Sequence, residues 1–362
     1  MPRHVFSASL TIALAASVAA QSPSPTATAP SSPVPSTLEA LDAADLQQAI
    51  PIIKQNYVDP AALNETELSR AVLAGLLSQL GRGVMLLPAR GPEPPPSPAP
   101  FYRETIAGHI GYLRPGNLSR DQLQEMDSTL RGLAGKKIDA LILDLRGSAE
   151  TIDYGMAAAF ANCFVPKGKP LFTLRGPGGK EVRAFVADQD PIYQGLLILL
   201  VDGETAGAAE ALAAVLRSCD KAILVGQTTA GRAVSYVDRP LPSGHILRIA
   251  VAQVTLPNQQ SPFPNGLTPD LPVTQSAAEK SQIFQRSLTK GMAFFVFETD
   301  RPHLNEAALL AGTNPEIDAA QAAQQRRGQN GDPPALHDAA LQRAVDVVTS
   351  IAVYEKQPGS PP

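Results

Sequence analysis

Cysteine and histidine are scarce in this chain, with two cysteines and five histidines in 362 residues. No C-x-x-C or H-E-x-x-H spacing is present, so we assign no metal site and no cofactor. A formal net charge of −4 and an isoelectric point near 5.8 argue against a nucleic-acid or anionic-membrane partner. After the N-terminus, no apolar run reaches the about 18–20 uncharged residues of a membrane span.

Residues 1–20 have the pattern of a signal peptide. Arg3 and His4 precede the apolar stretch Val5–Ala20, which ends in small residues. We therefore expect export to the periplasm or the extracellular space. Residues 21–38 follow as a linker rich in proline, serine and threonine.

Helical spacing of apolar side chains dominates residues 39–90. Pro51 is expected to kink or divide the first helical segment. Asn64 followed by Glu67 is a capping-box arrangement, which predicts a helix running through Leu80.

The middle of the chain alternates apolar strands with helices. Ile138–Leu145 and Leu196–Val201 have the composition of buried strands, and an Ala-rich helix is predicted over Thr205–Ser218. A second apolar run, Ala222–Val225, then ends in the Gly-rich turn Gly226–Gly231. Strand, helix, strand is a βαβ unit, so the predicted fold class is α/β and its chemistry is expected at the strand's carboxyl end.

Other elements complete the predicted core and an extension of residues 275–362. Alternation predicts strands at Leu171–Arg175, Glu181–Val186 and His245–Leu256. Helices are expected from a Ser119/Gln122 cap to Leu133, up to Val165-Pro166, over Ser276–Phe297 and over Leu336–Val353. In an oxidising compartment, Cys163 and Cys219 either form one disulfide or remain free thiols.

Two short motifs carry a resemblance to a known family. Residues 205–210 read TAGAAE and residues 230–236 read AGRAVSY. They resemble the S-A-S-A-S-E and F-G-K-G-x-V-Q motifs of the tail-specific (C-terminal processing) peptidases, which are serine peptidases with a Ser–Lys dyad. The stretch IAGHIGYL at Ile106–Leu113 resembles the family's I-G-Y-I strand, and LILDLR and GLTPD resemble further family motifs in the same order. The resemblance implies the family's α/β core, with βαβ crossovers, over residues 101–274, flanked by helical N- and C-terminal regions.

The same resemblance places the family's reacting groups on residues that differ from them. The nucleophile position is Gly207, the base position is Arg232 and the orienting glutamine position is Tyr236. Glycine offers no oxygen for attack on a carbonyl, and arginine, with a pKa above about 12, stays protonated. The sequence therefore predicts that the dyad's chemistry is absent.

Two further family features differ. The family inserts a substrate-capturing PDZ domain where this chain has only the Pro-rich spacer 91–100. The N-N-x-G-G oxyanion motif is replaced by Gly147–Thr151, in which Glu150 is expected to repel an oxyanion.

The sequence favours an exported, catalytically inactive homologue that binds a peptide, an unfolded segment or a partner protein. The candidate binding residues are Gly207, Ala208, Thr205, Arg232 and Tyr236. Arg232 is a candidate to hold a carboxylate such as a peptide C-terminus, unless it pairs with a neighbouring acid or faces solvent.

An active peptidase or acyl hydrolase with a relocated nucleophile is the alternative. Thr205 is the first candidate for that nucleophile, although a helix N-cap is its simpler role. The remaining candidates are the hydroxyls of Ser148, Thr228 and Ser235 and the bases His109 and His245.

Overall fold

The computed structural model describes residues 41–89, 98–133, 135–136, 138–296 and 336–355. The signal peptide and linker expected at residues 1–38 lie outside them, as does most of the spacer 91–100. Contacts divide the chain into two units, Met1–Val72 and Leu73–Pro362. None of the described helices is long and apolar enough to cross a membrane.

The N-terminal helices are α1 (Ala43–Asn56) and α2 (Glu65–Leu80), with a short 3-10 turn between them. Pro51 lies inside α1, so the expected division is wrong: the helix continues because one missing N–H removes only one of its hydrogen bonds. The Asn64 side chain accepts from the Glu67 amide at 3.0 Å, and α2 ends at Leu80, as predicted.

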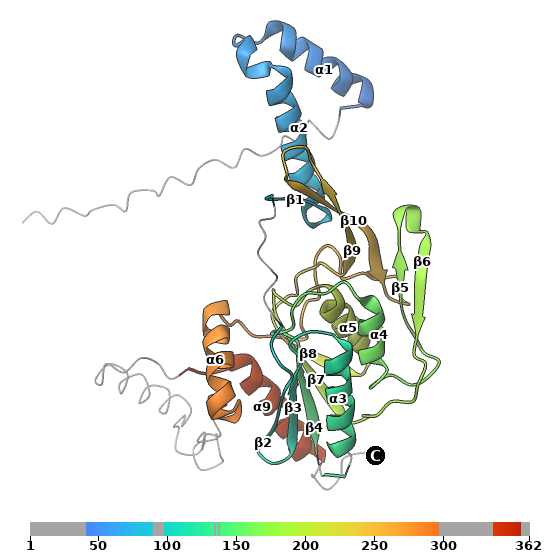
Figure 1. The fold of residues 1–362 in the computed structure, drawn as a ribbon, viewed down its shortest axis with the longest axis vertical. Coiled ribbons are helices and arrows are strands. Elements are labelled where there is room, and N and C mark those ends of the chain that lie inside the picture. The colour runs from blue at the N-terminus through green and yellow to red at the C-terminus, as the bar shows by residue number, and fades with distance from the viewer. Residues whose placement is uncertain (1–40, 90–97, 134, 137, 297–335, 356–362) are drawn as a thin grey trace, which may run out of the picture. The chain divides into compact units, whose positions relative to one another are not determined.

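A six-stranded sheet forms the centre of the larger unit (Figure 1). Its order is β11-β8-β7-β4-β3-β2, and only β2 runs antiparallel to its neighbour. Continuous apolar sequence suits strands that are buried on both faces. The strands are β2 (Tyr102–Ile106), β3 (Ile110–Arg114), β4 (Ala140–Asp144), β7 (Leu196–Val201), β8 (Ala222–Gly226) and β11 (Leu271–Pro272).

The strand expected over Ile106–Leu113 is confirmed for residues 110–113, which lie in β3, but its beginning is wrong because the chain reverses before Ile110. β2 ends at Ile106, and a turn with positive φ at Ala107 and Gly108 leads into the antiparallel strand β3. Two successive residues with positive φ are typical of a tight hairpin turn.

A second sheet is antiparallel and has the order β1-β10-β5-β6, with β9 also paired to β10. Three of its strands were predicted, whereas β1 and β9 were not. The strands are β1 (Val84–Leu87), β5 (Pro170–Arg175), β6 (Glu181–Val186), β9 (Val234–Pro240) and β10 (Ile246–Thr255).

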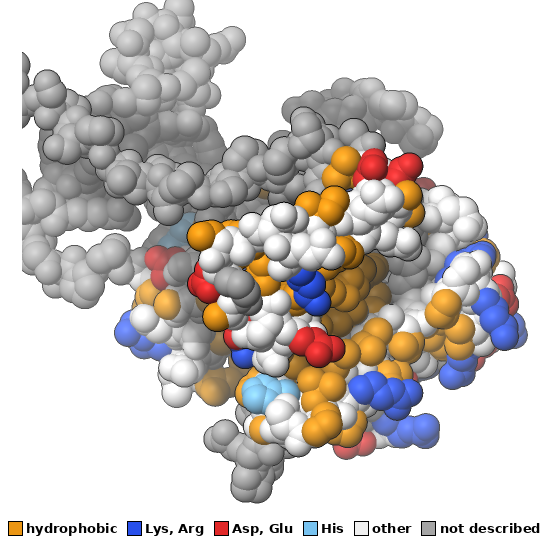
Figure 2. Space-filling model, turned by 90° about the horizontal axis from the view of Figure 1, so that it is seen from above, with side chains coloured by type: hydrophobic (Ala, Val, Ile, Leu, Met, Phe, Trp, Pro, Cys, Tyr) orange, Lys and Arg blue, Asp and Glu red, His pale blue; other side chains and the backbone are white. Residues whose placement is uncertain are grey.

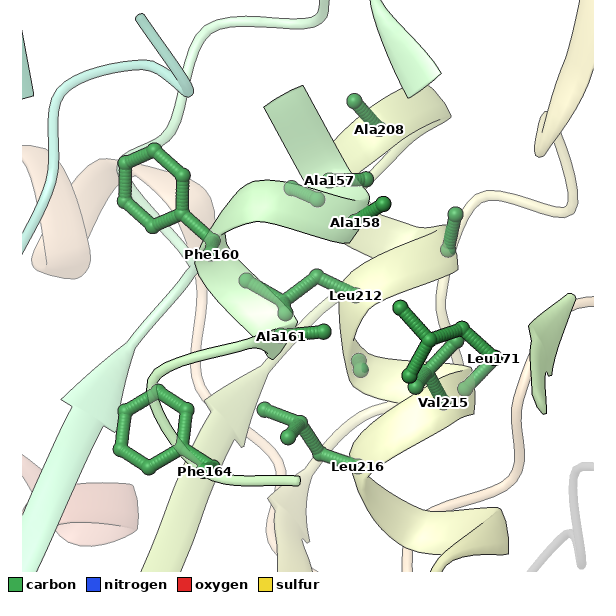
Figure 3. Close-up of a cluster of buried hydrophobic side chains, with 14 of the residues drawn as sticks. Ala157, Ala158, Phe160, Ala161, Phe164, Leu171, Ala208, Leu212, Val215 and Leu216 are labelled. Atoms are coloured by element: carbon green, nitrogen blue, oxygen red, sulfur yellow. The ribbon is translucent and has the colours of Figure 1, made fainter. Parts of the chain in front are cut away.

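Helices cover both faces of the central sheet. One face packs against α3 (Arg120–Leu133), α4 (Tyr154–Ala161) and α5 (Gly207–Ser218). Figure 3 shows side chains of α4 and α5 meeting within this cluster. The other face packs against α6 (Ala277–Lys290) and α9 (Ala339–Glu355).

Alternation along the strands divides the core between these faces. In β4, Leu141 and Leu143 join the first cluster, while Ile142 joins the second. The face of α9 predicted to dock does so, with Leu341 and Ala344 fully buried. The α/β class with flanking helical regions is therefore confirmed.

The ends of several helices differ from the predictions. α4 ends at Ala161 rather than near Pro166, and α6 ends at Lys290, where Gly291 adopts positive φ. Gln122 does not complete a cap with Ser119. The side-chain oxygen of Gln122, Oε1, accepts instead from the Gly116 amide at 2.6 Å.

Both cysteines are free thiols that lie just after helices α4 and α5. Burial raises the pKa of Cys163 to about 12 and also raises the pKa of Cys219. At the surface, Figure 2 shows hydrophobic side chains among charged side chains of both signs on one face.

Candidate functional site

The predicted site lies where β7 ends and α5 begins. Such positions collect functional groups because the carboxyl ends of parallel strands lie at one edge of the sheet. The chain turns through Asp202–Ala206 and enters α5 at Gly207. The loop between β4 and α4, residues 145–153 and here called the β4–α4 loop, contacts this turn.

Gly207 has φ +57°, a backbone conformation that residues with a side chain rarely adopt. A Cβ placed there would lie 2.3 Å from the Thr151 carbonyl oxygen and 3.3 Å from Cγ of Glu150. The β4–α4 loop therefore occupies the space that a nucleophilic side chain would need.

The next backbone amide is also engaged by the β4–α4 loop. The N–H of Ala208 donates to the Thr151 carbonyl oxygen at 2.8 Å. A backbone N–H at the start of a helix is a typical donor to an oxyanion, but this one already has an acceptor within the chain.

Arg232 pairs with Glu150. Its Nε donates to Oε1 at 3.2 Å and its terminal nitrogen donates to Oε2 at 2.9 Å, which is a bidentate contact. The hydrogen bond to Glu150 raises the pKa of Arg232 above its usual value. The acid expected to repel an oxyanion thus neutralises the arginine, and Arg232 follows the expected alternative of pairing with a neighbouring acid.

Glu210 organises the Gly-rich turn that carries Arg232. Its carboxylate is fully buried and accepts from the amides of Gly231 and Arg232, each at 2.7 Å, and from the Thr229 hydroxyl. Burial raises the pKa of Glu210, and these three donors oppose that shift. Glu210 is the last residue of the TAGAAE motif, but its role was not predicted; its place in an Ala-rich helix was the available signal.

Tyr236 lies on β9, and its hydroxyl donates to the Arg82 carbonyl oxygen at 2.9 Å. Burial, followed by the charge of Glu150, raises the pKa of Tyr236. Glu150 thus influences Tyr236 electrostatically while it contacts Arg232 and borders Gly207. The structure brings these three predicted positions together around one carboxylate.

Thr205 is fully buried and is not the helix N-cap, which is Ala206. Its hydroxyl accepts from the Asp202 amide at 3.1 Å, and its carbonyl oxygen accepts from the Ala230 amide at 3.0 Å. The expected capping role is wrong because α5 begins two residues later than predicted, so the Thr205 side chain closes the preceding turn instead.

The other hydroxyl candidates do not form a catalytic pair. Ser148 is buried and donates to the Pro115 carbonyl oxygen at 2.7 Å, whereas Thr228 is exposed and Ser235 lies half-buried on β9. Among the hydrogen bonds of the described residues, none joins any of the three to a histidine or lysine.

The two histidines lie away from these groups. His109 precedes β3 at the amino ends of the parallel strands, the edge opposite the site. Five to six strand residues, at about 3.3 Å each, separate the two edges. His245 is exposed in the turn between β9 and β10. Across the described ranges, no three His, Cys, Asp or Glu side chains are grouped to hold a metal ion.

A buried ionic cluster was missed by sequence analysis. Arg146 contacts Asp144 at 2.7 Å and Asp338 of the C-terminal region at 2.8 Å, and its side chain is 2% exposed. Burial alone would raise the pKa of Asp144, but the charge of Arg146 and its hydrogen bonds hold that pKa below its usual value. Lys280 of α6 likewise contacts Asp202 and Glu204.

Comparisons with known proteins agree with this architecture. Residues 109–273 match the model of Peptidase family S41. The carboxyl-terminal-processing protease of Synechocystis sp. is 28% identical over 177 residues, which are 48% of this chain and 40% of that protein. Carboxy-terminal processing protease CtpA of Bacillus subtilis is 26% identical over 152 residues, which are 42% of this chain and 32% of that protein.

Among solved structures, a photosystem II D1 C-terminal processing protease matches with a TM-score of 0.42 and 21% identity, over 49% of this chain and 48% of that one. The family model and the sequence relatives define a domain of the serine-peptidase class. The chain matches Peptidase family S41 over residues 109–273, so the resemblance to tail-specific peptidases is confirmed. It spans less than half the length of these two curated relatives.

Proposed function

We propose that this chain is a catalytically inactive member of peptidase family S41 that acts by binding a peptide or a partner protein. The observation that carries this proposal is the environment of Gly207. This position has no side chain, has a positive φ, and is filled by the Thr151 carbonyl oxygen where a Cβ would stand.

The remaining requirements of acyl transfer support the same proposal. Arg232 cannot become a neutral base, and its guanidinium is held by Glu150. The Ala208 amide, which is placed to stabilise an oxyanion, already donates to Thr151. A nucleophile, a base and an oxyanion donor are the three groups that this reaction needs.

The edge of the second sheet supports a binding role. In the described part of the chain, β6 pairs with β5 on one side only. Its Val182 and Val186 side chains are 61% and 51% exposed. An extended peptide can add to such an edge through backbone hydrogen bonds, with apolar side chains contributing specificity, and no nucleophile is required.

The catalytic part of the proposal is tested by cleavage of fluorogenic casein, with an intact Ser–Lys tail-specific peptidase as the positive control. We expect no turnover by the natural chain. The Gly207→Ser/Arg232→Lys variant should also be inactive, because restoring the two side chains does not move Thr151. Turnover by the natural chain would refute the proposal, and its loss in Thr205→Val would then identify the relocated nucleophile.

The binding part is tested with a fluorescein-labelled unstructured peptide library and the Val182→Lys/Val186→Lys variant. Charges on an exposed edge should weaken strand addition without disturbing the core. The control is Lys180→Glu, which changes the charge of the residue just before the strand and leaves both valines. Unchanged peptide binding by the valine variant would rule out this edge as the site.

A further inference from the structure

A cavity of about 570 Å³ opens between the β4–α4 loop and helix α6. One wall is a face of α6 on which the lining residues recur at helical spacing: Ala277, Ser281, Phe284 and Leu288. Gly147–Glu150 of the β4–α4 loop also line the cavity, together with Ala99, Pro100 and Gly116. This volume is typical of sites for small organic ligands.

Hydrogen bonds hold the segments that line the cavity in place. The Gln122 side chain accepts from the Gly116 amide at 2.6 Å and donates to the Ala99 carbonyl oxygen at 3.0 Å. Ser148 is held by Pro115. Gly147 has no side chain, and a Cβ there would lie 3.0 Å from the Phe284 ring and 3.5 Å from the Arg114 side chain. The cavity is therefore a formed feature of the fold.

Arg114 brings a positive charge to this cavity. The residue is 6% exposed, and its guanidinium donates to the Ser287 hydroxyl at 3.2 Å and to the Met292 sulfur at 3.4 Å, both neutral acceptors. Its terminal carbon also lies 4.0 Å from the centre of the Phe284 ring. Among the described residues, no carboxylate lies within ion-pair distance of Arg114.

The other cations at the cavity have acidic partners. Arg146 pairs with Asp144 and Asp338, and Lys280 pairs with two acids of the β7–α5 turn. Asp144 is close enough for Arg114 to contribute to lowering its pKa, but both of its oxygens already accept from other donors.

The acids at the cavity are likewise engaged. Glu150 is held by Arg232, and Glu204 is held by Lys280. Within the described part of the chain, the buried charge of Arg114 thus remains without an acid, and burial of an unpaired charge is costly.

We propose that this cavity binds a carboxylate carried on an apolar body. The carboxylate accepts from Arg114, whose planar guanidinium suits a bidentate contact with a monoanion. The apolar part packs against Phe284, Leu288 and Pro100. Two sources share this chemistry, namely the free C-terminus of an apolar peptide and a small organic acid. The proposal stands whether or not the chain is catalytic.

Isothermal titration calorimetry of the full chain tests the proposal with three probes: octanoate, the peptide Ac-Ala-Leu-Leu with a free carboxylate, and the same peptide as its amide. We expect at least one acid to bind, and the amide to bind about tenfold or more weakly, because it lacks the charge that Arg114 pairs with. Binding of octanoate alone assigns a small organic acid, and binding of the peptide acid alone assigns a C-terminus.

Exposed Gln285 provides variants that leave the core intact. Gln285→Glu should weaken binding of the acid about three- to tenfold and Gln285→Lys should strengthen it, since the residue lines the cavity. Gln282→Glu, on the same helix but outside the cavity lining, should change nothing. Arg114→Met should abolish binding in a sample whose circular dichroism is unchanged. Equal binding of acid and amide, no binding of either acid, or no response to charge at Gln285 would overturn the proposal.

Discussion

Arg146 and Arg232 both hold carboxylates, yet they lie at very different depths. The side chains of Arg146 and its two acids are at most 2% exposed, whereas those of Arg232 and Glu150 are 31% and 37% exposed. The first arginine joins β4 to the C-terminal helix α9, and the second joins the β4–α4 loop to the Gly-rich turn. The deep cluster stabilises the scaffold, while the shallow pair occupies the place where the family's chemistry is expected.

The largest effect is expected at the deep cluster. Asp338→Ala removes one of the two acids that neutralise Arg146 and leaves part of a buried charge uncompensated. The free energy of unfolding should fall by about 3–5 kcal/mol, measured by urea denaturation. Glu181→Ala, an exposed acid on β6, is the control and should change stability little. A loss below 1 kcal/mol for Asp338→Ala would remove the distinction between the two arginines.

The second effect concerns the backbone beneath the shallow pair. Gly207→Ala combines a positive φ with a contact to the Thr151 carbonyl, and we expect a loss of about 2–4 kcal/mol. Gly132→Ala, inside α3 with open space around it, should instead be neutral or stabilising by up to about 1 kcal/mol. Thermal unfolding of the two variants gives the comparison directly, and equal behaviour would contradict the crowding at Gly207.

Glu210 gives a third, pH-dependent effect. Glu210→Gln should cost about 1–3 kcal/mol at low pH, because the NH2 group of glutamine would face a donor, whereas both oxygens of a protonated carboxyl can still accept. Burial raises the pKa of Glu210 above its ordinary 4.5, so the folded state binds the proton more tightly than the unfolded chain. The stability that this tighter proton binding contributes is fully present below the pKa of Glu210 in the unfolded chain. It is lost as pH rises through the pKa of Glu210 in the folded state. The difference in free energy of unfolding between the wild type and Glu210→Gln should therefore shrink from pH 4 upwards. A difference that grows with pH would contradict the raised pKa of Glu210.

The smallest effect is expected for the shallow pair itself. Glu150→Gln should cost at most about 1 kcal/mol, because both side chains are partly exposed and water screens their attraction. The loss should diminish further in 1 M NaCl. Thermal unfolding without denaturant measures this loss. A salt-independent loss of several kcal/mol would show that the pair stabilises the fold as much as the deep cluster does.

Local patterns predicted the part of the fold that is continuous in sequence. β7, α5 and β8 follow from one stretch of apolar strand, small-residue helix and apolar strand, with the helix start misplaced by two residues. The start of the strand within Ile106–Leu113 was not predicted, because the reversal at Ala107 and Gly108 depends on backbone angles.

The contacts that define the site were harder to predict. Arg146 and Asp338 are 192 positions apart, so nothing in a single sequence pairs them. Thr151 acts through its carbonyl oxygen, an atom that every residue has and no motif marks. Glu150 was recognised as an acid near the site, but its partner Arg232 depends on how the loop and the turn meet in space.

The hydrogen bond from Ala208 to Thr151 also constrains how this sequence can change. A side chain at position 207 becomes tolerable only after the β4–α4 loop has moved, whereas movement of that loop would leave the Ala208 amide without its acceptor. Single substitutions at either place are therefore penalised before their combination brings a benefit. In such sign epistasis, the order in which substitutions arise decides whether position 207 can acquire a side chain.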